Sequence, residues 1–350
     1  MNERPLIYDL SREELGKVLE EWGEPTYRLR QLWEGLYHNL WHKADQFTVF
    51  PKPLRQKLDS YFIFESIFSE KESLADHGQT RKVLFHTLQG NPIETVLMQA
   101  LDRNTLCISS QSGCGMGCVF CATGQMGFIA NLTSGQIIEQ VLHFARLLKK
   151  ENKTLSNIVV MGMGEPFHNF ENVIRAIDQL NDPNGFNLGE RRFTISTVGI
   201  VPMIRKFAAL KRQINLAISL HAADDELRSQ LVPINRKYPL NTLLEACREY
   251  VNLTKRRLSF EWVMIKDIND SIQQAYRLTK LLKGLLCHVN LIPLNPTEGY
   301  TGQSPPKQRI KEFKAILEQN SIPCTVRLPR GISIHAGCGQ LATFYQRQNS

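Results

Sequence analysis

The segment CGMGCVFCATGQMGF (residues 114–128) holds three cysteines within eight positions, in the spacing C-x3-C-x2-C. They are Cys114, Cys118 and Cys121, and glycines stand on either side of the first and directly before the second. Three thiolates on a tight loop suit a soft metal, and the neighbouring sequence offers no fourth ligand, which leaves one coordination position open. The segment therefore indicates an iron–sulfur cluster in which one iron is free to bind another molecule.

A structural zinc site is the alternative interpretation of the same three thiols. Cys107 or His221 would then supply the fourth ligand. Zinc sites of this kind usually pair one C-x2-C unit with a second unit at comparable spacing. That second unit is absent from this sequence. The spacing favours the cluster and leaves zinc open as the alternative.

The composition is that of a globular protein, with 42% apolar and 22% charged residues among 350. No apolar run reaches the ~18 residues that a membrane-spanning helix needs, and the N-terminal stretch lacks the apolar core of a signal peptide. We therefore expect a cytoplasmic protein without a membrane partner. Thiols stay reduced in that compartment, so the eight cysteines are not expected to form a disulfide framework.

The charge favours a polyanionic partner such as nucleic acid, since the net charge is +8 and the pI is about 9.0. Residues 1–60 contain 9 basic against 10 acidic residues, whereas residues 61–350 contain 33 against 24, so the excess lies beyond the N-terminal segment. Candidate phosphate contacts are the basic groups Lys149-Lys150, Arg191-Arg192, Arg205-Lys206, Lys211-Arg212, Arg236-Lys237 and Lys255-Arg256-Arg257, with Arg327 and Arg330. Most such groups in proteins are solvated helix faces.

A small helical accessory module is predicted for residues 1–62. Ser11 and Glu14 form a capping box ahead of an apolar stripe, and residues 27–40 resume a period near 3.6. The aromatic side chains of this second helix are candidates either for the module's core or for stacking on RNA: Trp33, Tyr37 and Trp41.

A β-hairpin connector is predicted for residues 63–103, because two strand-like runs, 80–88 and 93–98, flank a turn that contains Gly and Pro. Residues 104–343 are expected to form the main domain, and residues 344–350 a tail. In the main domain six apolar runs alternate with helical periodicity: TLCIS, NIVVMG, RRFTIST, INLAISL, LSFEWVM and HVNLIPL. This pattern predicts an α/β fold with a parallel sheet covered by helices.

Parallel barrels carry their chemistry at the C-terminal ends of the strands. The cysteine cluster follows the first predicted strand, and polar or glycine-containing loops follow four of the others: MGMGEP, STVG, SLHAAD and PLNPTEG. These five loops are therefore expected to share one rim.

The cysteine spacing after a first strand resembles the radical S-adenosylmethionine (SAM) superfamily. That resemblance implies a partial barrel of six strand–helix units, one four-iron, four-sulfur cluster on Cys114, Cys118 and Cys121, and SAM chelated at the open iron. Reductive cleavage of SAM then yields a 5′-deoxyadenosyl radical. Further segments resemble the RNA adenine methyltransferases of the RlmN/Cfr type over nearly the whole chain: LCISSQSGCGMGCVFCATG, GMGEP, STVGIVP, SLHA, HVNLIPLNP and GCGQL.

This second resemblance implies that Cys338 carries the methyl group. One SAM methylates its sulfur, and a second SAM provides the radical that removes hydrogen from the S-methyl group, so two SAM molecules are used per turnover. The route suits adenine C2 and C8, which are too poorly nucleophilic to displace a methyl group from SAM directly. By the same resemblance Cys107 releases the protein–RNA crosslink and ends in a disulfide with Cys338, and Glu94 accepts the proton.

Taken without the resemblance, these residues have ordinary interpretations. Cys107 on an apolar strand is a small hydrophobic residue, and a lone Glu94 in a hairpin is a solvated surface residue. The family usually has Ala-Ala before the carrier cysteine, whereas this chain has Ala336-Gly337, which gives the carrier loop more freedom.

Residues that match the family's SAM contacts follow the predicted strands: Gly164, Glu165, Ser196, Ser219, Leu220, His221 and Asn295. Glu165 matches a partner of the SAM ammonium group. The ordinary interpretations are a helix cap for Ser196 and a buried core histidine for His221.

The resemblance implies methylation of adenosine C2 in 23S ribosomal RNA, together with an anticodon-loop adenosine in tRNA, and an electron donor such as flavodoxin or ferredoxin. The sequence Glu165-Pro166-Phe167 and the N-terminal module are more like the RlmN branch than the Cfr branch. Two alternatives stay open: C8 methylation of 23S ribosomal RNA, and a zinc-containing RNA-binding protein without enzymatic activity. In either methyltransferase the adenine must leave its stack to reach the carrier.

Overall fold

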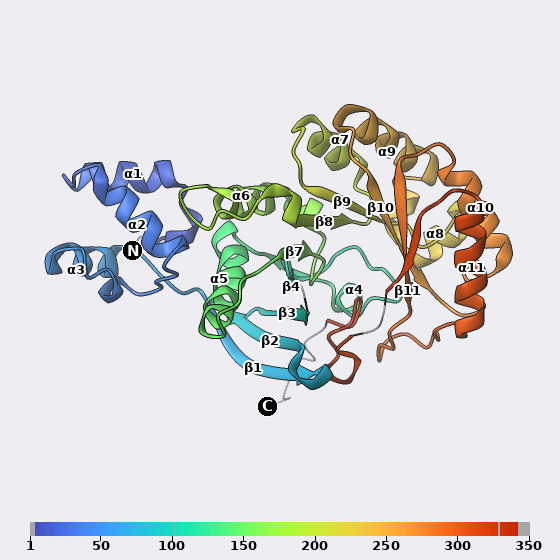
Figure 1. Cartoon of the computed structure of the whole chain (residues 1–350), viewed down its shortest axis with the longest axis horizontal. Coiled ribbons are helices and arrows are strands. Elements are labelled where there is room, and N and C mark those ends of the chain that lie inside the picture. The colour runs from blue at the N-terminus through green and yellow to red at the C-terminus, as the bar shows by residue number, and fades with distance from the viewer. Residues whose placement is uncertain (1–3, 102, 328–329, 342–350) are drawn as a thin grey trace.

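The computed structural model describes residues 4–101, 103–327 and 330–341. Within them, ten strands form one mixed sheet in the order β1-β2-β3-β4-β7-β8-β9-β10-β11-β12, and β5 and β6 form a separate small sheet. The first four strands are antiparallel and the remaining six continue the sheet in parallel. The helical module lies at one end of the molecule, and the helices of residues 201–319 lie at the other (Figure 1).

The N-terminal module consists of α1 (Arg12–Glu21), α2 (Tyr27–Tyr37) and α3 (Lys52–Tyr61). The predicted capping box is confirmed, because the Ser11 hydroxyl accepts the Glu14 N–H at 3.2 Å and the Glu14 carboxylate accepts the Ser11 N–H at 2.7 Å. Trp33 and Tyr37 are 1% exposed. They belong to the core of the module and are unavailable for stacking on RNA.

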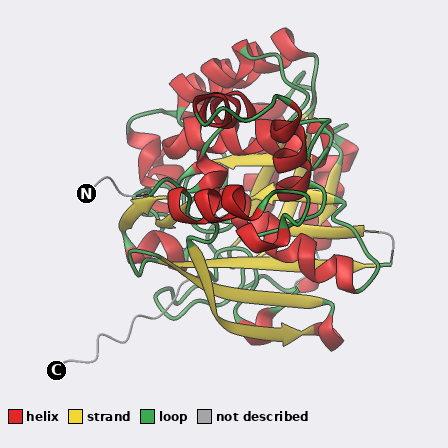
Figure 2. Cartoon of the chain, turned by 90° about the vertical axis from the view of Figure 1, so that its left-hand side faces the viewer, coloured by secondary structure: helices red, strands yellow, loops and turns green. Residues whose placement is uncertain are grey.

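The antiparallel strands are β1 (Ile67–Ala75), β2 (Thr80–Thr87), β3 (Pro92–Ala100) and β4 (Arg103–Ile108). The predicted hairpin is the β2–β3 pair, in which Leu84 lies opposite Glu94. The sequence analysis missed β1, whose middle residues are mostly exposed and lack apolar alternation. These long strands form the lower edge of the molecule in Figure 2, with helices above them.

The parallel strands after β4 are β7 (Asn157–Val160), β8 (Phe193–Thr197), β9 (Asn215–Ser219), β10 (Leu258–Met264), β11 (Cys287–Pro293) and β12 (Cys324–Val326). The helices between and after them are α5 (Ser134–Lys150), α6 (Phe170–Asn181), α7 (Val201–Ala209), α8 (Asp225–Leu231), α9 (Leu240–Thr254), α10 (Ile272–Leu282) and α11 (Lys307–Gln319). All six predicted strands are present in sequence order, which confirms the α/β partial barrel. The three-residue β12 is an addition to it.

Short 3-10 helices connect several of these elements: Ile7–Asp9, Ala44–Gln46, Asp76–Gly78, Pro166–Asn169, Glu190–Arg192, Pro233–Arg236 and Ile332–Ile334. In the described ranges, no helix combines the length and hydrophobicity required to cross a bilayer. The division of the chain at residues 62, 103 and 343 stays a prediction, and the predicted tail lies outside the described residues.

The buried carboxyl group of Glu139 on α5 gives stability a predictable pH dependence. It accepts the backbone N–H of Ser66 at 2.8 Å, and burial raises the pKa of Glu139 from 4.5 to about 8. The folded protein therefore holds the proton of the Glu139 carboxyl group more tightly than the unfolded chain does. The contribution of this group to the free energy of unfolding is full below pH 4.5 and is lost as the pH rises to about 8. We therefore compare Glu139→Gln with the parent protein at two pH values. The change in melting temperature caused by the substitution should be more favourable at pH 8.5 than at pH 6, by the equivalent of at least about 1.4 kcal/mol in the free energy of unfolding. Equal shifts at both pH values would contradict this.

Candidate active site

The cysteine loop lies between β5 (Gln111–Gly113) and α4 (Ala122–Met126), and β6 (Phe128–Asn131) pairs back onto β5. Gly113 has φ +68°, and a Cβ there would lie 2.0 Å from the Gly127 carbonyl oxygen, so this turn requires glycine. The next residue closes the loop, because the Cys114 N–H donates to the same carbonyl at 2.8 Å.

Cys114, Cys118 and Cys121 all line one cavity of about 150 Å³, here called the cofactor cavity. Burial raises the pKa of Cys114 to about 12, and burial together with the neighbouring thiols raises the pKa of Cys118 well above its ordinary value. Iron would stabilise the thiolates that this environment disfavours. In the described part of the chain, no three His, Cys, Asp or Glu side chains converge as ligands of a single metal ion. A cluster requires less convergence, because each of its three cysteines binds a different iron.

Glu165 follows β7 and lies at the wall of the cofactor cavity. Its carboxylate accepts the N–H groups of Phe167 at 3.0 Å and Val198 at 2.9 Å. Burial raises the pKa of Glu165 to about 7. Gly164 before it has φ +100°, and a Cβ there would lie 2.5 Å from the Gln111 Cβ. A cationic ligand such as an ammonium group would favour the ionised form of this carboxyl group.

Ser196 and Ser219 occupy the C-terminal ends of β8 and β9, and their hydroxyl oxygens lie 3.5 Å apart in the cofactor cavity. Ser196 does not cap a helix, because α7 begins at Val201 and its N-cap residue is Ile200. His221 lines the same cavity and accepts the Val263 N–H at Nδ1, 3.0 Å. Burial lowers the pKa of His221 to about 3, so the ring is neutral and carries its proton on Nε2.

The remaining two predicted SAM contacts lie differently. Asn295 lines the neighbouring cavity that contains Cys338, and its side-chain amide donates to the Cys338 carbonyl at 3.1 Å. The Leu220 side chain is fully buried in the main core, outside the described lining of the cofactor cavity. The Leu220 N–H donates to the backbone carbonyl of Glu261 at 3.0 Å, and the Leu220 carbonyl accepts the Nε–H of Arg228 at 3.1 Å.

Arg228 on α8 holds the loops after β8 and β9, and the sequence analysis did not identify it. It is fully buried and donates to the carbonyl oxygens of Val198 at 2.7 Å, Ser219 at 3.1 Å and Leu220 at 3.1 Å. Burial lowers the pKa of Arg228 to about 10. The arginine thus fixes the backbone that carries several of the predicted SAM contacts.

Arg228→Met should destabilise the fold and weaken SAM binding. Each buried carbonyl left without a donor costs about 1–3 kcal/mol, and the two loops would lose a common anchor. Thermal unfolding and calorimetric SAM titration measure both effects. Arg277→Met is the control, because Arg277 is exposed and its ion pair with Asp224 lies at the surface. Equal behaviour of the two variants would contradict the anchoring role.

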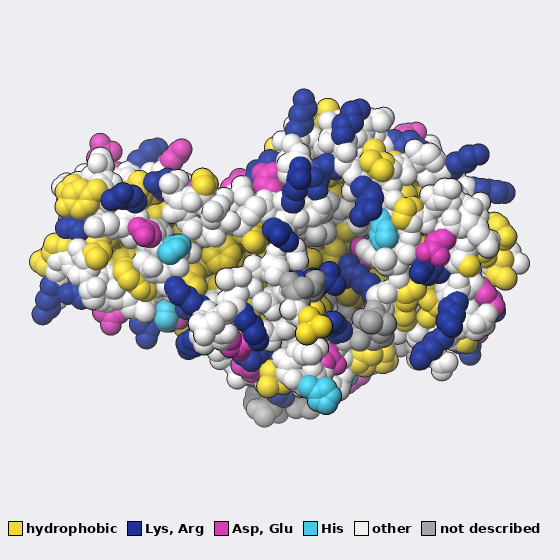
Figure 3. Space-filling model, viewed as in Figure 1, with side chains coloured by type: hydrophobic (Ala, Val, Ile, Leu, Met, Phe, Trp, Pro, Cys, Tyr) yellow, Lys and Arg dark blue, Asp and Glu magenta, His cyan; other side chains and the backbone are white. Residues whose placement is uncertain are grey.

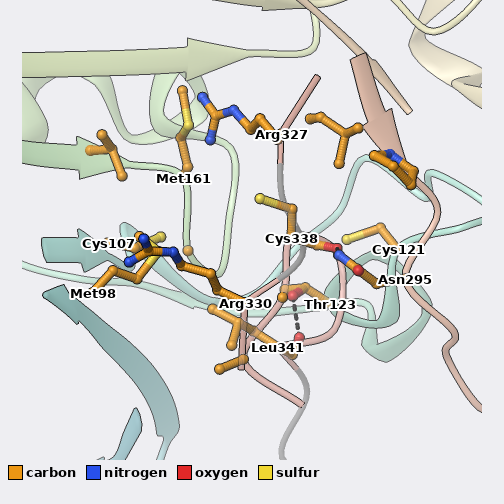
Figure 4. Close-up of a pocket in the computed structure, with 17 residues that line it drawn as sticks. Met98, Cys107, Cys121, Thr123, Met161, Asn295, Arg327, Arg330, Cys338 and Leu341 are labelled. Atoms are coloured by element: carbon orange, nitrogen blue, oxygen red, sulfur yellow. Dashed lines mark hydrogen bonds between the residues drawn. The ribbon is translucent and has the colours of Figure 1, made fainter. Parts of the chain in front are cut away.

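A second cavity, of about 170 Å³, holds the other two predicted reactive thiols and is here called the carrier cavity. Cys107 and Cys338 both line it, and so does the predicted cluster ligand Cys121. Figure 4 shows the Cys338 sulfur directed into the space between Cys107, Cys121 and Arg327. Both Cys107 and Cys338 are free thiols, so the expected disulfide between them stays a prediction.

Burial sets the thiol chemistry of the carrier cavity. Burial, with a smaller contribution from Cys338, raises the pKa of Cys107 to about 12. Cys338 is exposed at the mouth of the cavity, yet desolvation by the cavity wall raises its pKa, and the nearby Arg327 guanidinium opposes this rise. Arg327 is paired with Glu261 at 3.6 Å, and Asn290 donates to the Glu261 carboxylate at 2.8 Å. Glu261 was also missed, since a single carboxyl in an apolar strand gives no sequence signal of its partner.

Glu94 is not among the described residues that line the carrier cavity. Its carboxylate is buried and pairs with Lys82 at 2.8 Å, and its Oε2 accepts no hydrogen bond from the described residues. Lys82 in turn donates to the carbonyl of His335 in the Cys338 loop at 3.2 Å. Glu94 is therefore a buried ion-paired group, and the interpretation as a solvated surface residue is wrong.

Gly337 has a specific steric role in the carrier loop. A Cβ at this position would lie 2.7 Å from the Asn295 amide nitrogen and 2.7 Å from the Gln340 amide oxygen. The absence of a side chain lets both amides pack closely against the backbone beside Cys338. Gly337 therefore allows close packing of the carrier loop, in addition to the conformational freedom expected from the sequence.

Comparisons with known proteins agree with this arrangement. Residues 108–279 match the Radical SAM superfamily, and residues 6–63 match the "Ribosomal RNA large subunit methyltransferase N-terminal domain". The chain is 47% identical to the "Probable dual-specificity RNA methyltransferase RlmN" of Chloroflexus aurantiacus, over 97% of this chain and 93% of that protein. It is 45% identical to the "Dual-specificity RNA methyltransferase RlmN 1" of Myxococcus xanthus, over 98% and 96%. The chain belongs to the RlmN family of radical SAM methyltransferases.

A solved structure of a radical SAM methyltransferase from Sphaerobacter thermophilus supports the same assignment, with a TM-score of 0.94 and 48% identity over 96% of this chain and 98% of that one. As a member of the RlmN family, the protein is an enzyme that uses one four-iron, four-sulfur cluster and two SAM molecules per turnover. This excludes the zinc-containing protein without enzymatic activity. The buried thiols and the polar strand ends described above fit both cofactors.

Proposed function

We propose that this RlmN-family enzyme methylates C2 of an adenosine in 23S ribosomal RNA and of an anticodon-loop adenosine in tRNA. Relatives at 41–47% identity over nearly the whole chain are named dual-specificity RNA methyltransferases. The N-terminal module matches a domain named for large-subunit ribosomal RNA methylation. Both observations favour the RlmN reaction over the C8 alternative.

The cofactors are assigned by the donor groups of the cofactor cavity. Cys114, Cys118 and Cys121 hold the cluster, and the SAM contacts are Gly164, Glu165, Ser196, Ser219, Leu220, His221 and Asn295. When bound, the cluster and SAM supply a 5′-deoxyadenosyl radical. The Glu165 carboxylate binds the SAM ammonium group. Leu220 takes part through its position in the loop after β9, because its side chain is buried elsewhere.

The observation that carries the proposal is the shared lining of the two cavities. Cys338 and Cys121 each line both the cofactor cavity and the carrier cavity. A methyl group on the Cys338 sulfur would therefore lie beside the site where the radical forms. Arg327 favours the thiolate that accepts this methyl group, because its guanidinium opposes the rise in the pKa of Cys338 that desolvation causes.

Cys107 and Glu94 complete the proposed reaction. Cys107 lines the carrier cavity with Cys338, where attack on the Cys338 sulfur would release the crosslinked RNA as a disulfide forms. Glu94 accepts the proton that leaves the adenine ring. Lys82 bridges Glu94 to the Cys338 loop, which couples this base to the carrier.

RNA is the partner that the basic charge of the chain also favours. An acidic one-electron donor such as flavodoxin or ferredoxin would reduce the cluster. We propose a cytoplasmic location without a membrane partner, consistent with the composition.

Mass spectrometry of nucleosides tests the function. Ribosomal RNA and tRNA are compared between cells that lack this protein and cells to which it has been restored. Restoration should return 2-methyladenosine, and the RNA class that carries it identifies the substrate. Recovery of 8-methyladenosine would move the enzyme to the Cfr reaction, and recovery of neither nucleoside would contradict the proposal.

A further inference from the structure

A third cavity, of about 740 Å³, lies at the opposite end of the parallel strands from the cofactor loops. Thr194, Asn215 and Ser259, in the first two positions of β8, β9 and β10, line its inner part. The loops that precede these strands form the rim of the cavity. We call the whole cavity the amino-end cavity. Figure 3 shows Lys and Arg side chains gathered over this region of the parallel sheet.

The rim of the amino-end cavity is strongly cationic. It is lined by Arg191, Lys255, Arg256, Arg257 and Arg327, against the single carboxylate of Glu261. Among the described residues, only Arg327 of these five cations lies within ion-pair distance of a carboxylate. The charge of the other four is therefore not neutralised by the protein.

Other basic groups of the same domain are neutralised. Arg205 on α7 forms a two-pronged ion pair with Glu249, at 2.7 and 3.0 Å, and Lys206 pairs with Glu171. Arg212 pairs with Asp178 and Glu190. The structure thus separates basic groups that the sequence could not distinguish. The cations at the rim stay uncompensated and are available to a polyanion.

Neutral amides orient the guanidinium groups at the rim. Arg256 donates to the side-chain oxygens of Gln213 at 2.9 Å and Asn215 at 2.6 Å, and its buried Nε has no hydrogen-bond partner among the described residues. Arg191 donates to the same Gln213 oxygen at 3.4 Å. Amide partners hold the two arginines near each other without cancelling their charge. Two neighbouring guanidiniums of this kind suit phosphate oxygens.

The amino-end cavity adjoins the reaction site. Met161 and Arg327 line this cavity, the cofactor cavity and the carrier cavity alike. Ser259 in the amino-end cavity and Val263 in the cofactor cavity lie four residues apart on β10, which corresponds to about 13 Å along a strand. An extended nucleotide spans a comparable length. A base at Cys338 would therefore leave its backbone at the cationic rim.

We propose that the amino-end cavity binds the phosphodiester groups that flank the target adenosine, so that the base enters the barrel from the amino ends of the strands. The proposal rests on RNA being the substrate. Phosphates at the rim would hold the strand while the unstacked base reaches the carrier thiol. Arg191 and Arg257 are the contacts best suited to a test, because both are exposed and neither supports the core.

The test compares two double variants that remove the same charge. Arg191→Gln with Arg257→Gln removes two rim cations, and Arg205→Gln with Lys206→Gln removes two paired cations of α7. Fluorescence anisotropy measures binding of a labelled hairpin RNA with adenosine in its loop to each reconstituted holoenzyme over a range of salt concentrations. The rim variant should bind at least about tenfold more weakly, and the slope of log K against log salt should fall by about 1.4, or about 0.7 for each lost phosphate contact. The α7 variant should stay within about twofold of the parent protein.

Two results would overturn the proposal. Equal weakening of both variants would mean that affinity follows net charge alone, and unchanged binding of the rim variant would place the phosphate contacts elsewhere, for example on the helical module. Mass spectrometry of the Cys338 peptide should detect the same S-methylation in all three proteins, because the rim lies outside the reacting groups. If the parent protein methylates RNA and the rim variant binds RNA normally, only this inference is refuted. If the parent protein methylates no RNA, the proposed function is refuted.

Discussion

Replacing Cys338 with alanine is expected to reduce RNA methylation by at least about 10³-fold, while the iron content of the protein stays unchanged. The sulfur of Cys338 is the only atom proposed to carry the methyl group between SAM and adenine. Cys338 lies outside the loop that contains Cys114, Cys118 and Cys121, and reaches it only across the shared cavity. Loss of the carrier should therefore leave cluster assembly and SAM cleavage intact.

Three measurements on one preparation test this division of roles: iron and sulfide content, 5′-deoxyadenosine release, and methyladenosine in the RNA. Cys247→Ala is the matched control, because Cys247 is a fully buried free cysteine on α9 that lines neither cavity. It should keep all three values. Methylated RNA from the Cys338 variant, or loss of its iron, would contradict the carrier assignment.

The strands that the sequence predicted in the main domain share one property, which the missed strands lack. β7 to β11 are covered by helices, so their apolar runs are nearly continuous and stand out from the helical segments around them. β1 is a mostly exposed edge strand, and its composition resembles that of a loop. β12 has three residues, too few for any periodicity. Local pattern thus identified the buried part of the sheet and failed at its two edges.

The predicted site divides in the same way. The cysteines and the glycines around them could be found because ligand spacing and positive φ angles are local properties. Arg228 and Glu261 could not, because each is defined by partners from distant segments of the chain, and the sequence identified Arg327 only as a basic residue, without its contact to Glu261. The side-chain environment of Glu94 was misjudged for the same reason, since its partner Lys82 lies on the neighbouring strand.

Charge presents a further limit to prediction from sequence. Arg205-Lys206 and Arg256-Arg257 look alike as basic pairs, yet the first pair meets the carboxylates of Glu249 and Glu171 and the second faces a cavity. Only the folded chain determines which cations are neutralised. The salt dependence of RNA binding should follow that distinction, and not the number of basic residues.

Cys107→Ala is expected to stop the reaction before product release in the first cycle and to accumulate a covalent protein–RNA adduct. Once the carrier carbon has bonded to adenine, it joins the ring to the Cys338 sulfur, and release requires breaking that carbon–sulfur bond. Attack by the Cys107 sulfur on the Cys338 sulfur forms a disulfide and leaves the bonding electrons with the carbon, which becomes the methyl group by gaining a proton as the Cys107 thiol loses one. Burial raises the pKa of Cys107 to about 12, so this thiol stays protonated until release. Without it the thioether link should persist.

Denaturing gels with labelled RNA detect the adduct, and peptide mass spectrometry locates it on Cys338. The double variant Cys107→Ala with Cys338→Ala is the decisive control, because removal of the carrier should abolish the adduct that the single variant accumulates. Cys107 packs with Val96, Met163 and Leu341, so the thermal stability of each variant must be compared with that of the parent. Repeated turnover by the single variant would remove Cys107 from the reaction, whereas an adduct in the double variant would show that the RNA is bound through another residue.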